Sequence, residues 1–297
     1  MSTSLLIDTD VALGLRHDGR PRDIDDGFAI VEAINVDDLE LRGVTTVFGN
    51  APIDAVHRVA REIIDLKKVN VPVVEGAAQP LPQQGDLPDA NPAVEFLASQ
   101  LARAPLAVAA IGPLTNMALL VYHHPEVLTN ITSLIIVAGR SPGVQFYIGD
   151  VGPVRDFNFE NDVRAAELVM ASGVPLILAG FELTSQVTIT EADLATIAAR
   201  GGATSDYFHN NSLAWCQYWM EEFQEPGFHP WDSAAIAWLR HPEYFRSESR
   251  GWKIDRSGET PRLECNRNLP GTTVTYCTGF APGGADAFVR DVVNTVY

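Results

Sequence analysis

Cysteine, basic residues and long apolar runs are all scarce in this sequence, and each shortage excludes a class of protein. The 3 cysteines among 297 residues have no metal-like spacing, so neither a disulfide scaffold nor an oxidising compartment is expected. Lys and Arg number 21 against 38 Asp and Glu, which gives a formal net charge of -17. This balance argues against nucleic acid as a partner, because proteins that bind it normally present a basic patch.

The sequence also lacks the apolar segments of membrane and exported proteins. No run approaches the ~18 apolar residues that cross a bilayer. The chain enters the apolar residues Leu5–Ile7 directly, without the basic segment and long apolar stretch of a signal peptide. We therefore expect a soluble, cytoplasmic protein with no membrane partner.

Short apolar runs alternate with helical patterns over the first 180 residues. Leu5–Asp10 and Leu106–Ile111 are typical of buried strands, whereas Ala51–Lys68 has apolar residues at helical spacing. This alternation predicts an α/β fold with a mostly parallel central sheet flanked by helices. After about residue 190 the pattern predicts extra helices, then a small β element near residues 252–276 and a last helix. We expect a single domain over residues 1–297.

Acidic residues gather where the first predicted strand ends. Asp8 and Asp10 close that strand, and Asp25 and Asp26 precede a helical run. An N-cap role explains one such Asp, because carboxylates are favoured at helix N-termini. It does not explain several at one sheet edge, which repel each other unless a cation lies among them. Oxygen ligands alone point to calcium or magnesium rather than zinc.

Six short motifs follow one another in the order found in the nucleoside hydrolases, the inosine/uridine-preferring superfamily. The first, in two parts, resembles the DxDxGxDDxxA opening of that family, and the next four resemble its VTTVxGN, GAxxPL, GPLTN and PVxEFN segments. The sixth lies where the family has a hydrophobic or His residue followed by Asp. One of these motifs alone would be a weak signal, but six in order are a strong one. They lie at Leu5–Asp10 with Asp25–Ile30, at Val44–Asn50, Glu75–Leu81, Ile111–Asn116 and Pro153–Asn158, and at Trp231-Asp232.

The resemblance implies a calcium-dependent enzyme that hydrolyses the N-glycosidic bond of ribonucleosides. Calcium would be held by Asp10, Asp26, the main-chain carbonyl of Thr115, and Asp232. Asp10 would also be the general base that takes a proton from a calcium-bound water. Without the resemblance, an N-cap role for Asp232 would be an equally good interpretation. Family members are usually dimers or tetramers, so a homodimer or homotetramer is expected.

Further residues are assigned to the substrate by the same resemblance. Asp25 and Asn50 would bind ribose hydroxyls, and Asp156 and Asn158 would hold the 5′ side of the sugar, with Asp150 nearby. Turn chemistry is the alternative interpretation of the two asparagines. Trp231, before Asp232, stands where a purine-preferring branch has tryptophan, so we expect it to stack on a purine base and activate its departure in purine salvage. His229 is a weaker candidate for a leaving-group acid.

The sequence departs from the family pattern in three places. Fourteen residues, Val11–Ile24, replace a connection of about three, and they are either a mobile lid or a solvated surface insertion. Asp23 within them is an alternative to one of the assigned acids. Asp150 and Asp156 stand where the family more usually has Asn and Glu, so Asp156 is one methylene shorter.

Two other functions compete with this interpretation. A non-catalytic or altered-specificity sugar-binding protein on the same scaffold is one of them. The other is a phosphatase that uses Asp8 and Asp10 as nucleophile and acid. The phosphatase hypothesis leaves Asp25, Asp26 and the later motifs unexplained.

Overall fold

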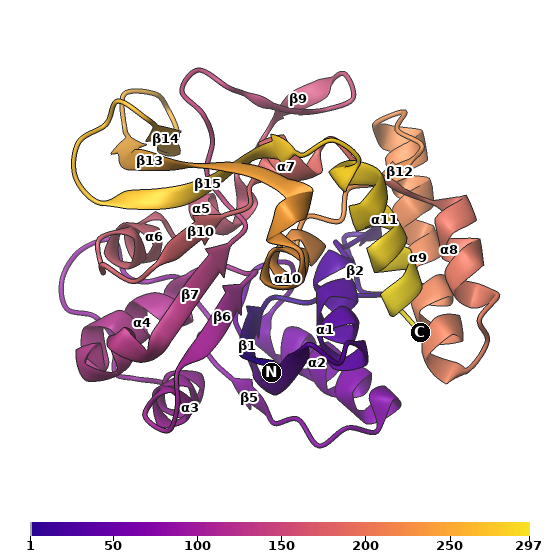
Figure 1. Ribbon diagram of the computed structural model, residues 1–297, viewed down its shortest axis with the longest axis horizontal. Coiled ribbons are helices and arrows are strands. Elements are labelled where there is room, and N and C mark those ends of the chain that lie inside the picture. The colour runs from indigo at the N-terminus through magenta and orange to yellow at the C-terminus, as the bar shows by residue number, and fades with distance from the viewer. Residues whose placement is uncertain (1) are drawn as a thin grey trace.

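The computed structural model describes residues 2–297 and is built around one nine-stranded sheet (Figure 1). From β5 to β15 the neighbouring strands are parallel, whereas β13 is antiparallel to both β15 and β14. In sheet order the strands are β5 (Val73–Glu75), β4 (Leu39–Thr46), β1 (Thr3–Thr9), β6 (Leu106–Ala110), β7 (Ile131–Ile136), β10 (Leu176–Leu178), β15 (Thr273–Phe280), β13 (Phe245–Asp255) and β14 (Arg262–Asn266).

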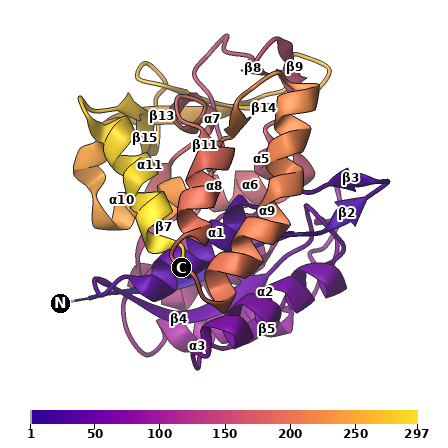
Figure 2. The same ribbon diagram turned by 90° about the vertical axis from the view of Figure 1, so that its right-hand side faces the viewer.

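Helices cover both faces of this sheet, as the two views in Figures 1 and 2 show. The longest, α9, is 20 residues long. Within residues 2–297 no helix combines the length and the apolar character needed to cross a bilayer. The helices are α1 (Asp25–Asn35), α2 (Ile53–Lys67), α3 (Pro92–Leu101), α4 (Thr115–His123), η1 (Pro125–Asn130), α5 (Phe157–Asn161), α6 (Val163–Met170), α7 (Phe181–Thr184), α8 (Glu191–Ala198), α9 (Ala203–Glu222), α10 (Ser233–Arg240), η2 (Pro242–Tyr244) and α11 (Gly284–Thr295).

The apolar run in β1 shows why the sheet is buried on both sides. Successive side chains of a strand point to opposite faces. Leu5 and Ile7 accordingly join one hydrophobic cluster and Leu6 joins the other. All three side chains are completely buried. A run without alternation is typical of a parallel strand covered by helices on both faces, so the predicted fold class is confirmed.

The carboxyl ends of the central strands meet at one edge of the sheet. Asp8 in β1 is level with Thr45 of β4 on one side and with Ala110 of β6 on the other. Ligands of open parallel sheets bind at such an edge, where the chain leaves the strands for the helices. The loops that follow β1, β4 and β6 therefore start at the same place.

Two features differ from what the sequence predicted. The C-terminal strands β13, β14 and β15 are not a separate small β element, because β15 pairs with β10 and extends the central sheet. The insertion Val11–Ile24 contains a short hairpin of β2 (Arg16–His17) and β3 (Arg20–Pro21). Sequence patterns also missed the β8 (Phe146–Ile148) and β9 (Val151–Val154) hairpin and the pair of β11 (Ile189–Thr190) with β12 (Gly227–Phe228).

Candidate active site

Four buried aspartates meet beyond the carboxyl end of β1. Asp10 follows that strand, Asp25 and Asp26 begin α1, and Asp232 directly precedes α10. Carboxylate oxygens of Asp25, Asp26 and Asp232 all lie within 4.8 Å of one another. The N–H of Asp232 donates to Asp25 Oδ2 at 2.9 Å, and the N–H of Asp10 donates to Asp26 Oδ1 at 3.2 Å. Three separate chain segments are thus joined through these carboxylates.

The orientation of Asp10 is fixed by the loop after β4. The main-chain N–H of Asn50 donates to Asp10 Oδ2 at 2.7 Å. A Cβ on Gly49 would lie only 1.9 Å from the same oxygen, so a residue with a side chain does not fit at this position. The other oxygen, Oδ1, is buried and has no hydrogen-bond partner among the described residues.

Asp8 stabilises the site through hydrogen bonds to residues of neighbouring segments. Its Oδ1 accepts hydrogen bonds from Thr45 Oγ1 at 2.6 Å and from Asn116 Nδ2 at 2.8 Å. The Asn116 side chain also donates to the main-chain oxygen of Thr46 at 3.0 Å. The Thr9 hydroxyl donates to Asp26. These bonds tie the ends of β1, β4 and β6 together, because Asn116 follows β6 in the GPLTN motif.

Burial has a large effect on the charges of these carboxyl groups. It raises the pKa of Asp26 to about 7 and that of Asp8 to about 6. The pKa values of Asp10 and Asp232 are raised well above their usual range, first by burial and then by the charges of neighbouring aspartates. A cation among them would remove this repulsion. Asp10 Oδ1 and Asp26 Oδ2 are buried and unpartnered, and all donors here are oxygens, so the residues fit a hard divalent ion.

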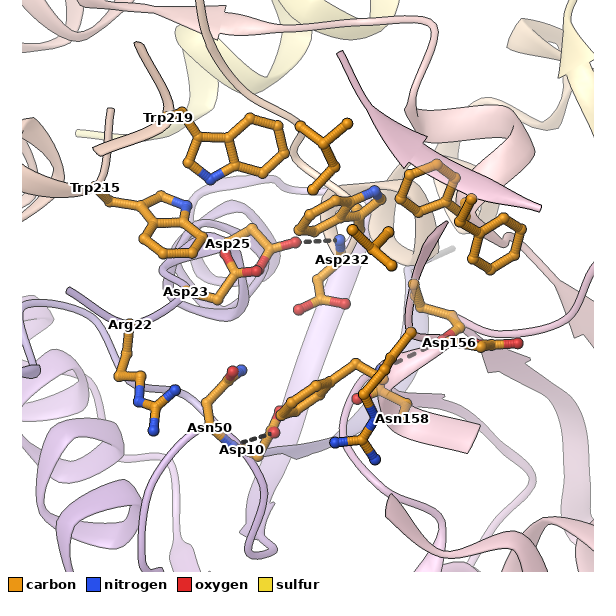
Figure 3. A pocket seen from close by; sticks show the side chains of 18 of the residues that line it. Asp10, Arg22, Asp23, Asp25, Asn50, Asp156, Asn158, Trp215, Trp219 and Asp232 are labelled. Atoms are coloured by element: carbon orange, nitrogen blue, oxygen red, sulfur yellow. Dashed lines mark hydrogen bonds between the residues drawn. The ribbon is translucent and has the colours of Figure 1, made fainter. Parts of the chain in front are cut away.

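A cavity of about 500 Å³ opens above the aspartates (Figure 3). Its lining includes seven of the predicted site residues: Asp10, Asp25, Asn50, Asp156, Asn158, Trp231 and Asp232. Three are absent from the lining. Asp26 lies buried beside Asp10, and Thr115 begins α4, where its hydroxyl donates to Asp162 at 2.7 Å. Asp150 is exposed in the turn between β8 and β9, so the structure does not bring it to the cavity.

Asp156 and Asn158 lie across the cavity from Asn50 in Figure 3. Asp156 Oδ2 accepts a hydrogen bond from the N–H of Gly139 at 2.9 Å. Burial raises its pKa to about 6, although the nearby Arg140 guanidinium opposes the shift. Asn158 Nδ2 donates to the main-chain oxygen of Ile111 at 2.9 Å. Both side chains are therefore held by main-chain atoms at the ends of β6 and β7.

Aromatic side chains enclose the rest of the cavity. Trp231 stacks on Phe181 with ring centroids 6.0 Å apart, and Phe181 stacks on Phe146 at 4.3 Å. From α9, Trp215, Tyr218, Trp219 and Phe223 also contribute to the lining. No sequence motif marks Phe146 or Phe181 as part of the site. The one available signal was that Phe181 follows the carboxyl end of β10 by three residues.

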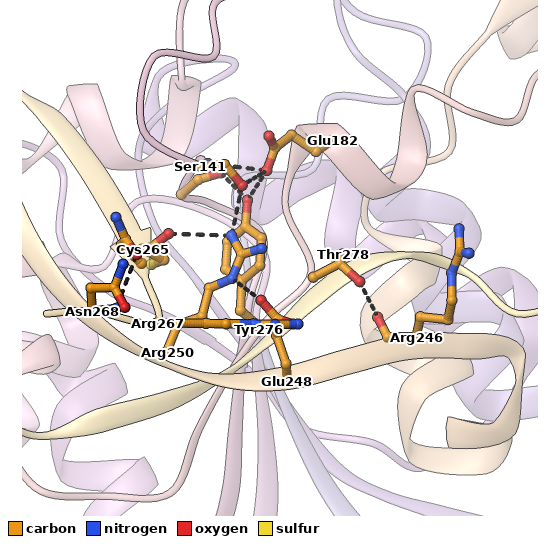
Figure 4. A network of polar contacts seen from close by, with 12 residues as sticks. Ser141, Glu182, Arg246, Glu248, Arg250, Cys265, Arg267, Asn268, Tyr276 and Thr278 are labelled. Carbon is orange, nitrogen blue, oxygen red and sulfur yellow. Dashed lines mark hydrogen bonds and ion pairs between the residues drawn. The ribbon is translucent and has the colours of Figure 1, made fainter.

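A polar network behind α7 holds Phe181 in place (Figure 4). Glu182, the next residue, accepts hydrogen bonds from Ser141 Oγ at 2.9 Å and from the Tyr276 hydroxyl in β15. Arg250 of β13 donates to Ser141 Oγ at 2.6 Å and lies 4.3 Å from the Tyr276 ring centroid. The C-terminal strands thus position one wall of the cavity.

His229, the weaker candidate for a leaving-group acid, is not part of the cavity lining. Its side chain is buried, and its Nδ1 lies 2.6 Å from the main-chain oxygen of Val187. Burial lowers its pKa, which favours the neutral ring. His229 packs edge-on against Trp219 at 4.9 Å and Trp231 at 5.8 Å. It supports the aromatic wall.

Comparison with known proteins defines the class. The model of the family described as inosine-uridine preferring nucleoside hydrolase matches residues 5–280, so the chain belongs to this family of enzymes that hydrolyse the N-glycosidic bonds of ribonucleosides. The resemblance inferred from the six motifs is confirmed. The phosphatase alternative is wrong, because the family match accounts for the segments that alternative left unexplained.

Relatives of this chain are named for different substrates. The chain is 30% identical over 262 residues to the pyrimidine-specific ribonucleoside hydrolase RihA of Salmonella typhimurium, covering 79% of this chain and 82% of that protein. Among solved structures, a purine-preferring ribonucleoside hydrolase from Gardnerella vaginalis superposes with a TM-score of 0.82 at 20% identity, covering 99% of each chain. A plant nucleoside hydrolase gives the same TM-score, identity and coverage. These structural matches establish the fold.

Proposed function

We propose that this enzyme is a calcium-dependent ribonucleoside hydrolase that prefers purines. The proposal rests on the position of Trp231 between the clustered carboxylates and the aromatic wall of the cavity. It is adjacent in sequence to Asp232, one of the clustered carboxylates, and it stacks on Phe181 in the cavity wall. A nucleoside placed with its ribose near the aspartates then has its base among the aromatic rings.

Calcium would be held by Asp10, Asp26 and Asp232, together with the main-chain carbonyl of Thr115. Asp25 lies in the same group of carboxylates, so it is close enough to contribute an oxygen as well. When bound, the ion supplies positive charge that offsets the carboxylate repulsion and makes a water easier to deprotonate. The unpartnered oxygens Asp10 Oδ1 and Asp26 Oδ2 support this assignment.

Five polar side chains of the cavity lining then have roles in hydrolysis. Asp10 Oδ1 takes a proton from a water as that water attacks C1′ of the ribose. Asp25 and Asn50 bind the ribose hydroxyls, and Asp156 and Asn158 hold the 5′ side. The C1′–N bond breaks through an oxocarbenium-like sugar, much as in glycosidases, and its electron pair leaves with the base. No covalent intermediate is needed.

The purine preference follows from the aromatic wall. The indole N–H of Trp231 is far too weak an acid to protonate a departing base, so stacking is the contribution this residue can make. Base–aromatic stacking is worth about 1–3 kcal/mol per base, and a purine offers more ring area than a pyrimidine. Trp219, with its ring centroid 5.4 Å from that of Trp231, extends the aromatic surface.

Pyrimidine ribosides are the second candidate substrates, because RihA, at 30% identity, is named as pyrimidine-specific. A reducing-sugar assay with inosine, guanosine, adenosine, uridine and cytidine separates the two. We expect the highest kcat/KM with a purine riboside. A clear preference for uridine or cytidine would refute the purine proposal and leave the family assignment intact. Tight binding of ribose without turnover of any riboside would favour the non-catalytic alternative.

A further inference from the structure

The insertion Val11–Ile24 is part of the cavity wall rather than a free surface loop. Leu13 and Ile24, near its two ends, are buried in the core. A Cβ on Gly14 would lie 2.4 Å from Asn211 Oδ1 in α9, so the insertion packs closely against that helix. Strand β3 also packs against α9. Arg22 and Asp23, which follow β3, therefore line the same cavity as Trp215 and Trp219 of α9.

Residues 20–23 of the insertion all line the cavity, and Arg22 is the one among them with a buried side-chain donor that has no partner in the described chain. This donor is its Nε. Among residues 2–297 no carboxylate lies within ion-pair distance of its guanidinium. By contrast, Arg16 in the same hairpin donates to the main-chain oxygen of Gly19 at 3.0 Å, and Arg155 pairs with Glu160 at 3.2 Å.

Other donors without acceptors belong to the lining of the same cavity. The indole Nε1 atoms of Trp215, Trp219 and Trp231 are buried and have no hydrogen-bond partner among the described residues. Buried donors are normally paired, and those left unpaired in a native protein call for a specific explanation. In Figure 3, Arg22 and Trp215 lie on one side of the cavity, and Asp156 and Asn158 lie on the other. Within the described part of the chain, the cavity thus has three unpaired indole N–H groups and an unpaired guanidinium.

We propose that Arg22 contacts the leaving nucleobase and stabilises the negative charge that develops on it. This inference rests on the proposed function, in which the base lies among the aromatic rings. As the C1′–N bond breaks, its electron pair moves onto the base, which departs as an anion. The attacking water supplies the new C1′–O bond, and its proton goes to Asp10. A positive charge beside the base lowers the barrier without donating a proton, and solvent protonates the free base afterwards.

The dependence of the rate on the leaving group tests this role. Arg22→Met and Arg22→Lys are compared with the wild type on inosine, uridine and nitrophenyl riboside. We expect Arg22→Met to lower kcat about 10²-fold on inosine, the loss typical for removal of one charge-stabilising donor. The loss on nitrophenyl riboside, whose leaving group is already a stable anion, should be about tenfold or less. Arg22→Lys keeps the charge and should recover part of the loss.

Arg16→Met is the matched control, because this arginine belongs to the same hairpin and does not line the cavity. It should keep wild-type kinetics. Calcium affinity and the thermal midpoint are measured for every variant, and Arg22→Lys and Arg22→Gln decide the outcome if Arg22→Met does not fold. Equal losses on all three substrates, or no loss, would overturn the role of Arg22 and leave the proposed function standing. A wild-type enzyme that cleaves no riboside would overturn both.

Discussion

The main-chain N–H of Asn50 donates a 2.7 Å hydrogen bond to Oδ2 of Asp10, so the loop after β4 sets the orientation of a carboxylate that follows β1. This bond occupies one oxygen of Asp10 and leaves Oδ1 buried without a partner. The two oxygens are therefore unequal, and the unpartnered one is available to a cation and to the proton of the attacking water.

The first prediction concerns this unpartnered oxygen. Asp10→Asn should lower kcat by about 10³-fold, the contribution typical of a general base, because an amide does not accept the proton of water. Release of reducing sugar from a riboside measures the loss. Asp18→Asn is the control, because that carboxylate is 88% exposed at the hairpin tip. Near wild-type turnover by Asp10→Asn would exclude Asp10 as the base.

Removal of divalent ions should destabilise the protein. Without an ion, the carboxylates of Asp25, Asp26 and Asp232 lie within 4.8 Å of one another in a buried site. A ligand present at 100 times its Kd contributes about 2.7 kcal/mol to the free energy of unfolding. Dialysis against a chelator should lower the thermal midpoint, and calcium should restore it. Asp232→Asn should reduce this response, and an unchanged midpoint would contradict the proposed calcium site.

A third prediction separates stacking from packing at Trp231. Trp231→Ala should lower kcat/KM on inosine by about 5- to 150-fold, the equivalent of 1–3 kcal/mol of base stacking. The loss on nitrophenyl riboside should be much smaller, because its leaving group needs no activation. Trp231→Phe keeps an aromatic face and should retain more activity. Equal losses of Trp231→Ala on both substrates would show that the indole packs the cavity without activating the base.

The fourth prediction concerns the effect of Glu32 on how the free energy of unfolding depends on pH. This side chain of α1 is buried and accepts a hydrogen bond from Ser233, and burial raises its pKa from 4.5 to about 8. The folded state holds the proton of Glu32 more tightly than the unfolded state, so protonation of Glu32 adds to the free energy of unfolding. This contribution is complete below about pH 4.5 and is lost as the pH rises through 8. The loss amounts to roughly 1.4 kcal/mol for each pH unit between those values.

Glu32→Gln should remove this pH-dependent loss of stability, because glutamine resembles the protonated acid and keeps an oxygen that accepts the hydrogen bond from Ser233. Chemical denaturation should give similar free energies of unfolding for both proteins near pH 5. At pH 8 the variant should be the more stable one. Glu259→Gln, at an exposed position, should track the wild type throughout. A variant that is less stable than the wild type at pH 8 would show that Glu32 is ionised in the folded state.

Sequence patterns predicted the elements that have a strong local signal. Leu5–Ile7 are apolar without alternation, which is typical of a strand buried on both faces. The motif residues Asp10, Asn50 and Asp232 lie at the ends of elements whose periodicity is clear. The family resemblance therefore located seven of the residues that line the cavity.

Other features depend on contacts between distant segments. Strand β13 contains the polar run Arg246-Ser247-Glu248-Ser249-Arg250, so no apolar alternation marks it in the sequence. Asp150 belongs to a matched region, but it is exposed in the turn between β8 and β9. The stacking of Phe146 on Phe181 joins residues 35 positions apart in the sequence, and nothing local predicts that contact.

The hydrogen bond from Asp232 to Asp25 spans 207 residues and has consequences for biosynthesis. A ribosome must translate past residue 232 before the carboxylate group can close, and past β15 before the sheet edge at β10 is covered. Until then the early strands exist with an unpaired edge and an incomplete cluster of acids. An ion can therefore bind with full affinity only after the chain has been translated past Asp232, and products truncated before that residue should not retain it. Products that lack β15 should aggregate through the uncovered edge of the sheet.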